Sequence, residues 1–333
     1  MKREEFVQAS ATTRVYEKSL LRRDQIDRMT DAKTIDDVFR ILSETDYSER
    51  ISKLDDKYDI DTFLDGEINH FYSEIYGVTT YKNIVDIMAI YYIYHNLKVI
   101  VKESIVDEDL ERLYCKLRRD VTDEIRLTIS RGEKLSETDK YRETVNRALE
   151  DYEVSKDPQR IDLIIDRCYY NHLNILSREI NVPMLNRYSK NTIDFYNVKL
   201  TLRAKSQNKK LDFVDEFLVA GGNINLDEFR LNYFDSIDSI ISKLKNYDIS
   251  PYLQKGLEGY KSNGKISEFD KAMQNYQMDI AKESKRITYG PEVLFSYLVA
   301  KEAEVESIRV IFTAKINDLP PDEIRVRLRD LYV

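Results

Sequence analysis

The chain has 333 residues, enough for two or three domains with buried cores, and carries 42% hydrophobic and 34% charged residues. Nine Gly and six Pro are about half of ordinary usage, which disfavours all-β folds because their turns consume both residues. The formal net charge of −8 argues against general nucleic-acid binding, which needs a basic face. We therefore expect an all-α protein with no nucleic-acid partner.

The cysteines and the apolar runs bear on the compartment. Cys115 and Cys168 lie outside any Cys-x-x-Cys motif, which favours a reducing compartment without disulfides. The N-terminal residues Met1 to Glu5 contain no apolar signal core. The longest nearly apolar run, residues 84–94, is interrupted by Asp86, and a membrane span needs roughly 20 apolar residues. We expect a cytoplasmic chain without a direct membrane span, although such a chain can sit on a complex that has one.

In chain order, helices are expected throughout. Thr12 or Thr13 is a candidate N-cap for the first, whose apolar stripe runs through Tyr16 and Leu20. Further helices are predicted at 35–42 after Thr34, at 61–76 before a C-cap at Gly77, and at 81–102. Exposed helices over 103–152 are expected to join near Arg131-Gly132, and Pro158 suits the first turn of the next helix. Breaks or loops are predicted at 181–183, 220–223, 259–264 and 289–291, and a short basic helix begun by proline ends the chain.

One pattern recurs three times, at residues 94–102, 195–203 and 305–313. Aligning Lys98, Lys199 and Arg309 gives spacings of 101 and 110 residues. The apolar positions that repeat with them are Ile87, Tyr94, Leu97 and Val101; Tyr188, Phe195, Val198 and Leu202; and Leu298, Val305, Ile308 and Phe312. Steps of seven, three and four place each set on one face of a helix. The sequence therefore predicts three similar helical domains, at 1–115, 116–220 and 221–333.

Two motifs suggest enzymes. Gly259 to Lys265 reads G-x-x-x-x-G-K, but Ile266 stands where a P-loop needs Ser or Thr, and no strand precedes it. Asp55 to Asp59 reads D-D-x-x-D, which binds magnesium and diphosphate in all-helical isoprenoid synthases. Those enzymes need a second acidic cluster, and residues 212–216 are an imperfect candidate. An isoprenoid-synthase-like enzyme stays the alternative, beside a generic α-helical scaffold.

Other catalytic or metal sites are not indicated. The three histidines, His70, His95 and His172, form no metal-ligand spacing, and no serine stands in a G-x-S-x-G elbow. The basic stretch 199–210 is interpreted as a helix end and solvated loop, with a phosphate or lipid-headgroup contact as the alternative. We predict no catalytic residue, metal or cofactor.

The repeats and both chain ends resemble the C subunit of the V-type and A-type ATPases, whose eukaryotic counterpart is called d. The resemblance covers nearly the whole chain. It rests on Arg14-x-x-Glu17-x-x-Leu20-Leu21, Leu42-x-x-Thr45-Asp46-Tyr47, Ile193-Asp194-x-x-Asn197-Val198-Lys199-x-x-Leu202-Arg203, Gly221-Gly222, Tyr297-x-x-x-Lys301-Glu302-x-Glu304-x-x-x-Ile308-Arg309 and Ile324-Arg325-x-Arg327-Leu328-Arg329-x-x-Tyr332-Val333. The first repeat departs from the pattern at Tyr91, Tyr92 and Tyr94.

The resemblance implies three domains arranged as a funnel around a pseudo-threefold axis. It further implies a non-catalytic rotor protein, one copy per complex, that links the D and F subunits of the central shaft to the membrane proteolipid ring and couples ATP turnover to H+ or Na+ transport. The candidate contact residues are Asn96, Lys98, Asn197, Lys199, Arg203, Arg309, Arg325 and Arg329. Arg325 and Arg329 are expected on one helical face, either at a partner or buttressing the third domain.

Overall fold

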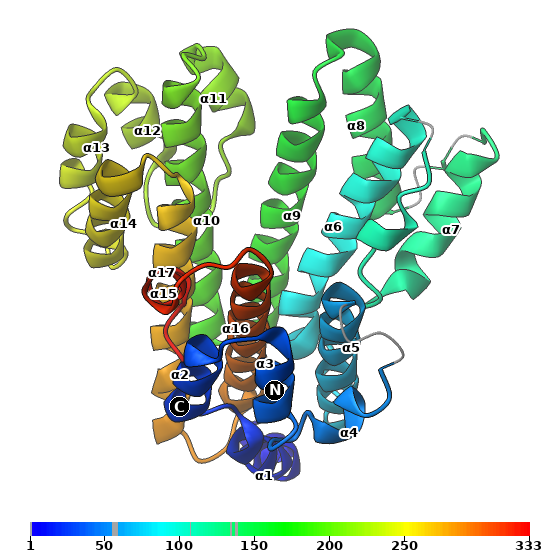
Figure 1. Ribbon diagram of the computed structural model, residues 1–333. Helices are drawn as coiled ribbons and strands as arrows, with labels where there is room; N and C mark the ends of the chain where they lie inside the picture. Colours follow the sequence, from blue (N-terminus) through cyan, green and yellow to red (C-terminus); the bar gives the residue numbers. More distant parts are fainter. Residues whose placement is uncertain (1, 55–58, 107, 134, 137–138) are drawn as a thin grey trace. The chain divides into compact units, whose positions relative to one another are not determined.

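The computed structural model describes residues 2–54, 59–106, 108–133, 135–136 and 139–333. Every regular element in these ranges is a helix, so the all-α prediction is confirmed (Figure 1). The chain divides into two compact units. Unit 1 combines Met1–Val85 with Gln274–Val333, and unit 2 is Asp86–Met273.

Unit 1 brings the two ends of the chain together. Its elements are η1 (Arg3–Phe6), α1 (Val7–Tyr16), η2 (Glu17–Ser19), α2 (Arg23–Asp31), α3 (Ile35–Leu42), α4 (Ser48–Ile51), α5 (Ile60–Val78), η4 (Ser284–Arg286), α16 (Pro291–Ile316) and α17 (Pro321–Arg327). The long helix α16 packs against α5 and α1, and most of its side chains are buried. Phe312 of α16 lies with its ring centroid 4.8 Å from that of Phe39 on α3. The core of this unit therefore lies around α16.

Unit 2 contains the middle of the chain. Its elements are η3 (Glu111–Leu113), α7 (Arg119–Ser130), α8 (Lys140–Ser155), α9 (Pro158–Ile180), α10 (Pro183–Ser206), α11 (Leu211–Phe217), α12 (Leu226–Asn232), α13 (Ile237–Lys243) and α14 (Ser250–Asn263). Most of α6 (Asn83–Val106) and the start of α15 (Ser267–Glu283) also belong to it, because these two helices run from one unit into the other. The most extensive packing within this unit joins α9 to α8 and to α10.

The three repeats fall on three long helices, α6, α10 and α16. All twelve apolar positions of the repeated pattern are buried, and none of these residues is more than 6% exposed. The predicted helical face is therefore confirmed in every copy. Each motif helix follows another long helix, α5, α9 or α15, across a short connection. The repeating unit thus contains a pair of long helices.

The helix boundaries follow their capping residues. Thr34 caps α3 as predicted, accepting from the Asp37 N–H at 3.1 Å. Pro158 begins α9, which ends at Ile180 and is followed by Asn181 as a left-handed C-cap. Gly290 has φ of 152°, a conformation that side chains disfavour, just before α16 begins.

Two predicted caps are wrong. Thr13 lies inside α1, which begins earlier, and its hydroxyl donates to the Ala9 carbonyl at 2.8 Å. Gly77 lies inside α5, which continues to Val78 before Thr79 adopts an extended conformation. In both places the helix extends past a residue that favours a boundary.

By length and composition, α6 is the one helix in the described ranges that qualifies as a membrane span. However, 78% of its most apolar window is buried inside the protein, and a core helix passes the same test. This is weak evidence for a span.

Candidate functional site

The repeated cations of the motif helices form ion pairs within the chain. The Lys98 ammonium on α6 lies 2.6 Å from the Asp166 carboxylate on α9, and Lys199 on α10 lies 2.5 Å from Asp270 on α15. Arg309 on α16 pairs with Asp61 on α5, with Asp65 at 3.8 Å. We call these contacts the first, second and third seams. Each joins a motif helix to the long helix that precedes the next motif helix, and the third returns to the first repeat.

The acids of the seams repeat with the cations. Asp61 and Asp65 precede Asp162 and Asp166 by 101 residues, the same interval that separates Lys98 from Lys199. The first seam has a further pair, because Lys102 lies 2.8 Å from Asp162. The repeated pattern used in the sequence analysis included the cations but not their acidic partners. The 101-residue interval between the aspartates was the sequence signal that could have identified them.

The second pair of the first seam, Lys102 with Asp162, has no counterpart at the equivalent positions of the second seam. Arg203 occupies the position of Lys102, but the position of Asp162 is taken by Ile266, the residue before α15 begins. The Arg203 side chain is exposed, and the described residues offer it no carboxylate within ion-pair distance. Three of the predicted contact cations therefore have acidic partners within the chain: Lys98, Lys199 and Arg309. Arg203 has no ion pair among the described residues.

The two repeated asparagines hold backbone segments. The Asn96 amide donates to the Cys115 carbonyl at 3.0 Å and accepts from the Cys115 N–H at 2.9 Å. The Asn197 amide makes the same two contacts with Val219, at 2.8 and 2.9 Å. Both side chains are fully buried, so these predicted contact residues face the protein's own backbone. In the third repeat Ser307 takes this position and bonds within its helix.

The buried acid Asp194 was not among the predicted site residues. Asp194 on α10 accepts from the backbone N–H groups of Asn223 at 2.8 Å and Ile224 at 3.1 Å. Burial raises the pKa of Asp194 to about 6, although these hydrogen bonds oppose the shift. Gly222 was the signal, because a Cβ there would lie 2.0 Å from the Asp194 Oδ1.

Glu304 is the counterpart of Asp194 in the third repeat. Its carboxylate accepts from the Leu21 N–H and the Tyr47 hydroxyl, each at 2.5 Å, and pairs with the Lys301 ammonium at 2.6 Å. Burial first, and Glu304 second, raise the pKa of Tyr47 far above its usual range. This network is buried inside unit 1. It joins the motif residues Leu21, Tyr47, Lys301 and Glu304 of the family resemblance.

The C-terminal arginines make contacts within unit 1. Arg325 lies 2.5 Å from Asp31 on α2, and Arg329 donates to the Gln274 side chain at 2.7 Å. The expectation that both lie on one helical face is wrong, because α17 ends at Arg327 and Leu328 is extended. Tyr332 continues the contact by donating to Glu17 at 3.1 Å. These contacts buttress the end of the chain.

The G-x-x-x-x-G-K motif does not form the predicted loop. Gly259 to Asn263 lie in α14, and Gly264 follows as the left-handed C-cap with φ of 72°. A P-loop needs a phosphate cradle at the start of a helix, whereas this motif lies at the end of one.

The acidic motif lies mostly outside the described residues, since these omit 55–58. Asp59 itself caps α5, accepting from the Thr62 N–H at 3.1 Å. No group of three or more His, Cys, Asp or Glu that could hold a metal is found in the described part of the chain. Both cysteines are free thiols in this structure.

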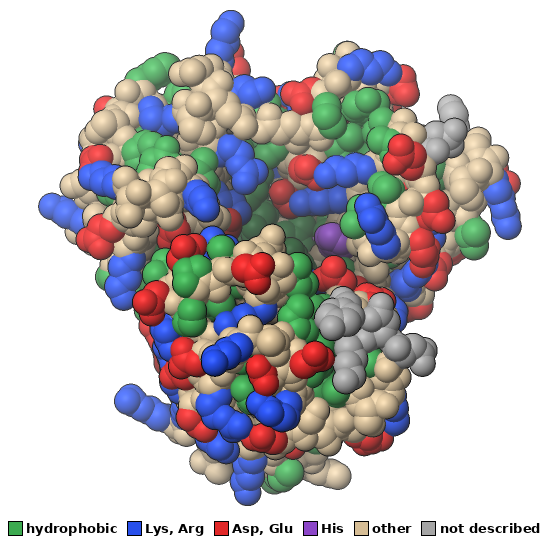
Figure 2. Space-filling view, in the orientation of Figure 1, with side chains coloured by type: hydrophobic (Ala, Val, Ile, Leu, Met, Phe, Trp, Pro, Cys, Tyr) green, Lys and Arg blue, Asp and Glu red, His purple; other side chains and the backbone are tan. Residues whose placement is uncertain are grey.

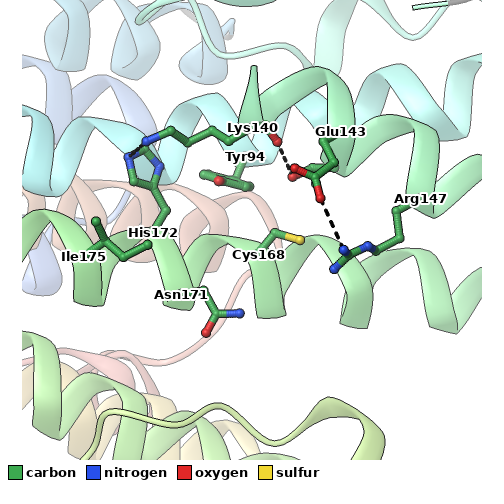
Figure 3. A pocket seen from close by; sticks show the side chains of 9 residues that line it. Tyr94, Lys140, Glu143, Arg147, Cys168, Asn171, His172 and Ile175 are labelled. Carbon is green, nitrogen blue, oxygen red and sulfur yellow. Dashed lines mark hydrogen bonds and ion pairs between the residues drawn. The ribbon is translucent and has the colours of Figure 1, made fainter. Parts of the chain in front are cut away.

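Unit 2 has a shallow pocket of about 190 Å³ between α6, α8 and α9 (Figure 3). Tyr94, Lys140, Cys168 and His172 are among its lining residues. The Lys140 ammonium donates to His172 Nε2 at 2.8 Å, which leaves the ring proton on Nδ1. Burial and Lys140 lower the pKa of His172 to about 4, so this imidazole is neutral at pH 7. No described hydrogen bond joins His172 to Cys168.

The charged surface is mixed. Figure 2 shows Lys and Arg side chains interspersed with Asp and Glu on the visible parts of both units. Most of the described cations on the helices have an acidic neighbour, as in Arg160 with Asp151 and Glu216. Such a surface favours specific charge contacts over a broad basic field.

Known proteins resemble this chain along nearly its whole length. The C subunit of the V-type sodium ATPase of Enterococcus hirae is 24% identical over 98% of this chain and 99% of its own length. The C subunit of the A-type ATP synthase of Methanosphaera stadtmanae is 23% identical over 93% and 84%, and that of Methanocaldococcus jannaschii is 22% identical over 98% and 86%. The family model for the ATP synthase (C/AC39) subunit matches residues 9–327. The chain therefore belongs to the ATP synthase (C/AC39) subunit family.

Proposed function

We propose that this protein is a non-catalytic rotor component of a V/A-type ATPase. In this role it joins the D and F subunits of the central shaft to the membrane proteolipid ring, one copy per complex. It couples ATP hydrolysis or synthesis to H+ or Na+ transport from the cytoplasmic face of the membrane. The observation that carries the proposal is the family match over residues 9–327.

The repeats support a role in transmitting torque. We propose that residues 1–115, 116–220 and 221–333 form three similar domains arranged as a funnel. Long helices with few glycines resist bending, and the same kind of ion pair links successive repeats. A stiff, repeated adaptor suits a connection between a ring of many copies and a single shaft.

The polar residues of the motif helices support a structural role. Asn96 and Asn197 bind backbone segments, and Glu304 belongs to a buried network. Each has a role in folding that requires no substrate. The nucleotide-like motif at Gly259 to Lys265 lies at the end of a helix, which is unsuited to cradling phosphates.

Reconstitution with and without this protein tests the proposal. Omitting it from a complex of soluble head, shaft and membrane sector should leave ATP hydrolysis by the head largely intact, while ATP-driven ion transport is lost. Normal transport per ATP in its absence would reject the coupling role and favour a generic helical scaffold.

A further inference from the structure

The loop at residues 218–225 joins α11 to α12 and is held to α10 by side chains. Its residues form no helix, and the N–H groups of residues 219–224 donate to no described backbone carbonyl. Those of Asn223 and Ile224 donate instead to the Asp194 carboxylate, at 2.8 and 3.1 Å. Because α12 follows directly and packs on α10 (Figure 1), this contact fixes where α12 begins.

Two glycines bring the loop close to the carboxylate. Gly221 has φ of 107°, a conformation that side chains disfavour, and lies against Asn174 of α9. Gly222 lies against Asp194 itself, at a distance that leaves no room for a Cβ. Glycine gains more backbone freedom than any other residue when a segment is released. Backbone entropy therefore favours release of this loop, and the hydrogen bonds to Asp194 oppose it.

The carboxylate that holds the loop is buried without an ion pair. Asp194 is 0% exposed, and none of the described ion pairs includes it. The charged and titratable groups that act on it are Lys190, one turn earlier on α10, and Tyr247 after α13, which donates to Glu228 of α12. From α9, the neutral Asn174 faces the loop. Burial disfavours the ionised carboxylate and outweighs the hydrogen bonds, which raises the pKa of Asp194 to about 6.

We propose that this loop is a proton-controlled latch, which is held when Asp194 carries a proton and loosens when the carboxylate is ionised. Opening the loop lets water reach the carboxylate, which removes the cost of burying the charge. Opening therefore becomes easier as the charge forms, and the start of α12 is then held less firmly on α10. A neutral carboxyl still accepts hydrogen bonds on its carbonyl oxygen, so the protonated latch keeps its contact with the loop. The inference concerns unit 2 alone and does not depend on the rotor role.

The direction of the pH effect follows from the proton affinities of the closed and open loop. In the closed loop the pKa of Asp194 is about 6, whereas in the hydrated open loop it returns to the usual 3.8. The closed loop therefore binds the proton more tightly. This advantage is complete below about pH 4 and is lost as the pH rises through about 6. Between about pH 4.5 and about pH 7.5, the equilibrium constant for opening should rise about twentyfold.

Amide hydrogen exchange of the full-length protein measures this opening. The protection of the Asn223 and Ile224 N–H groups, corrected for the intrinsic exchange rate, should fall about twentyfold over this pH range and level off above about pH 6. A low concentration of urea should leave it unchanged, because local opening exposes little surface. The Cys115 N–H is the internal control, since Asn96 holds it at 2.9 Å without an ionisable group. Its protection should change less than about twofold.

Two variants test the role of the carboxylate. Asp194→Asn removes the ionisable group, so the pH dependence at Ile224 should disappear. Asn223→Ala keeps the carboxylate but removes the side-chain amide that donates to it at 3.2 Å, which favours the protonated form. In this second variant the fall in protection should therefore extend to a higher pH, which keeps the test open if Asp194→Asn does not fold. Asn246→Ala changes another exposed asparagine of unit 2 and, as the matched control, should leave the profile unchanged.

Three results would overturn the latch. Protection at Ile224 that is independent of pH, or that rises with pH, would show that the charge does not control the loop. The same twentyfold fall at Cys115, or exchange at Ile224 that a low concentration of urea accelerates, would assign the effect to unfolding of the whole unit. An Asp194→Asn variant that folds and keeps the natural pH profile would assign the effect to another group.

Discussion

The motif helices carry two kinds of polar residue, and they differ in what surrounds them. Asn197, Asp194 and Glu304 are buried and have several hydrogen-bond partners within the chain. The seam cations Lys98, Lys199 and Arg309 are a quarter to a third exposed, with one or two acidic partners each. Burial makes a missing partner costly, whereas solvent replaces much of a lost surface pair. The buried set should therefore determine stability, and the seams should adjust it.

The largest effect is expected at Glu304. Replacing Glu304 by Ala leaves the buried Lys301 ammonium without its carboxylate and the Leu21 N–H without its acceptor. We expect a loss of about 3–5 kcal/mol in the free energy of unfolding, measured by urea titration. Glu306→Ala, two residues along the same helix, should cost less than about 0.5 kcal/mol. Similar losses in the two variants would contradict the distinction between buried and exposed residues.

Asp194 should make stability depend on pH. Its folded pKa is about 6, above the usual 3.8, so the folded state holds the proton more tightly than the unfolded state does. This contribution is complete below about pH 4 and is lost as pH rises through 6, which amounts to on the order of 2–3 kcal/mol. The Asp194→Asn variant lacks it. Denaturation of both proteins between pH 4 and 7 should show their stability curves diverging with this sign, and parallel curves would refute it.

The two asparagine contacts offer a finer comparison. Asn197→Ala leaves both polar groups of buried Val219 without partners, whereas Cys115, the partner of Asn96, is partly exposed to water. We expect losses of about 2–3 kcal/mol for Asn197→Ala and about 1–2 kcal/mol for Asn96→Ala. Chemical denaturation should show the larger loss in the free energy of unfolding for Asn197→Ala. A larger loss for Asn96→Ala would mean that exposure of the bound segment does not control this loss.

The seams should show the smallest effects. Lys98→Ala and Lys199→Ala should each cost about 0–1 kcal/mol, because both pairs are partly solvated. Raising the salt concentration from about 0.1 to about 1 M should reduce the difference from the natural protein further. A cost above about 2 kcal/mol that persists in high salt would place the seams with the buried network.

The sequence predicted those features that local patterns determine. Steps of seven, three and four identified the buried faces of α6, α10 and α16, and Thr34, Pro158 and Asn181 marked helix ends. The repeated polar residues were also visible. The groups that these residues contact could not be predicted, because a helix position shared by three copies can contact a partner or the chain itself. Asn96 and Asn197 were expected at partners but bind backbone.

The errors arose where tertiary packing overrides a local preference. Gly259 and Gly264 favoured a loop, yet α14 continues through Gly259 and ends at Asn263. Gly256 in the same helix lets Phe269 of α15 approach, since a Cβ would lie 2.8 Å from that ring. Single-sequence patterns do not identify such contacts between distant residues. The acids of the seams and the Glu304 network were missed for the same reason.

The most direct test of the rotor role is an add-back titration. Complexes lacking this protein are reconstituted into vesicles, and ions transported per ATP hydrolysed are measured as the purified protein is returned. If the protein couples the shaft to the ring, this ratio should rise from near zero and reach its plateau at one copy per complex. A ratio that is already normal without the protein, or that does not respond to its addition, would rule out the coupling role.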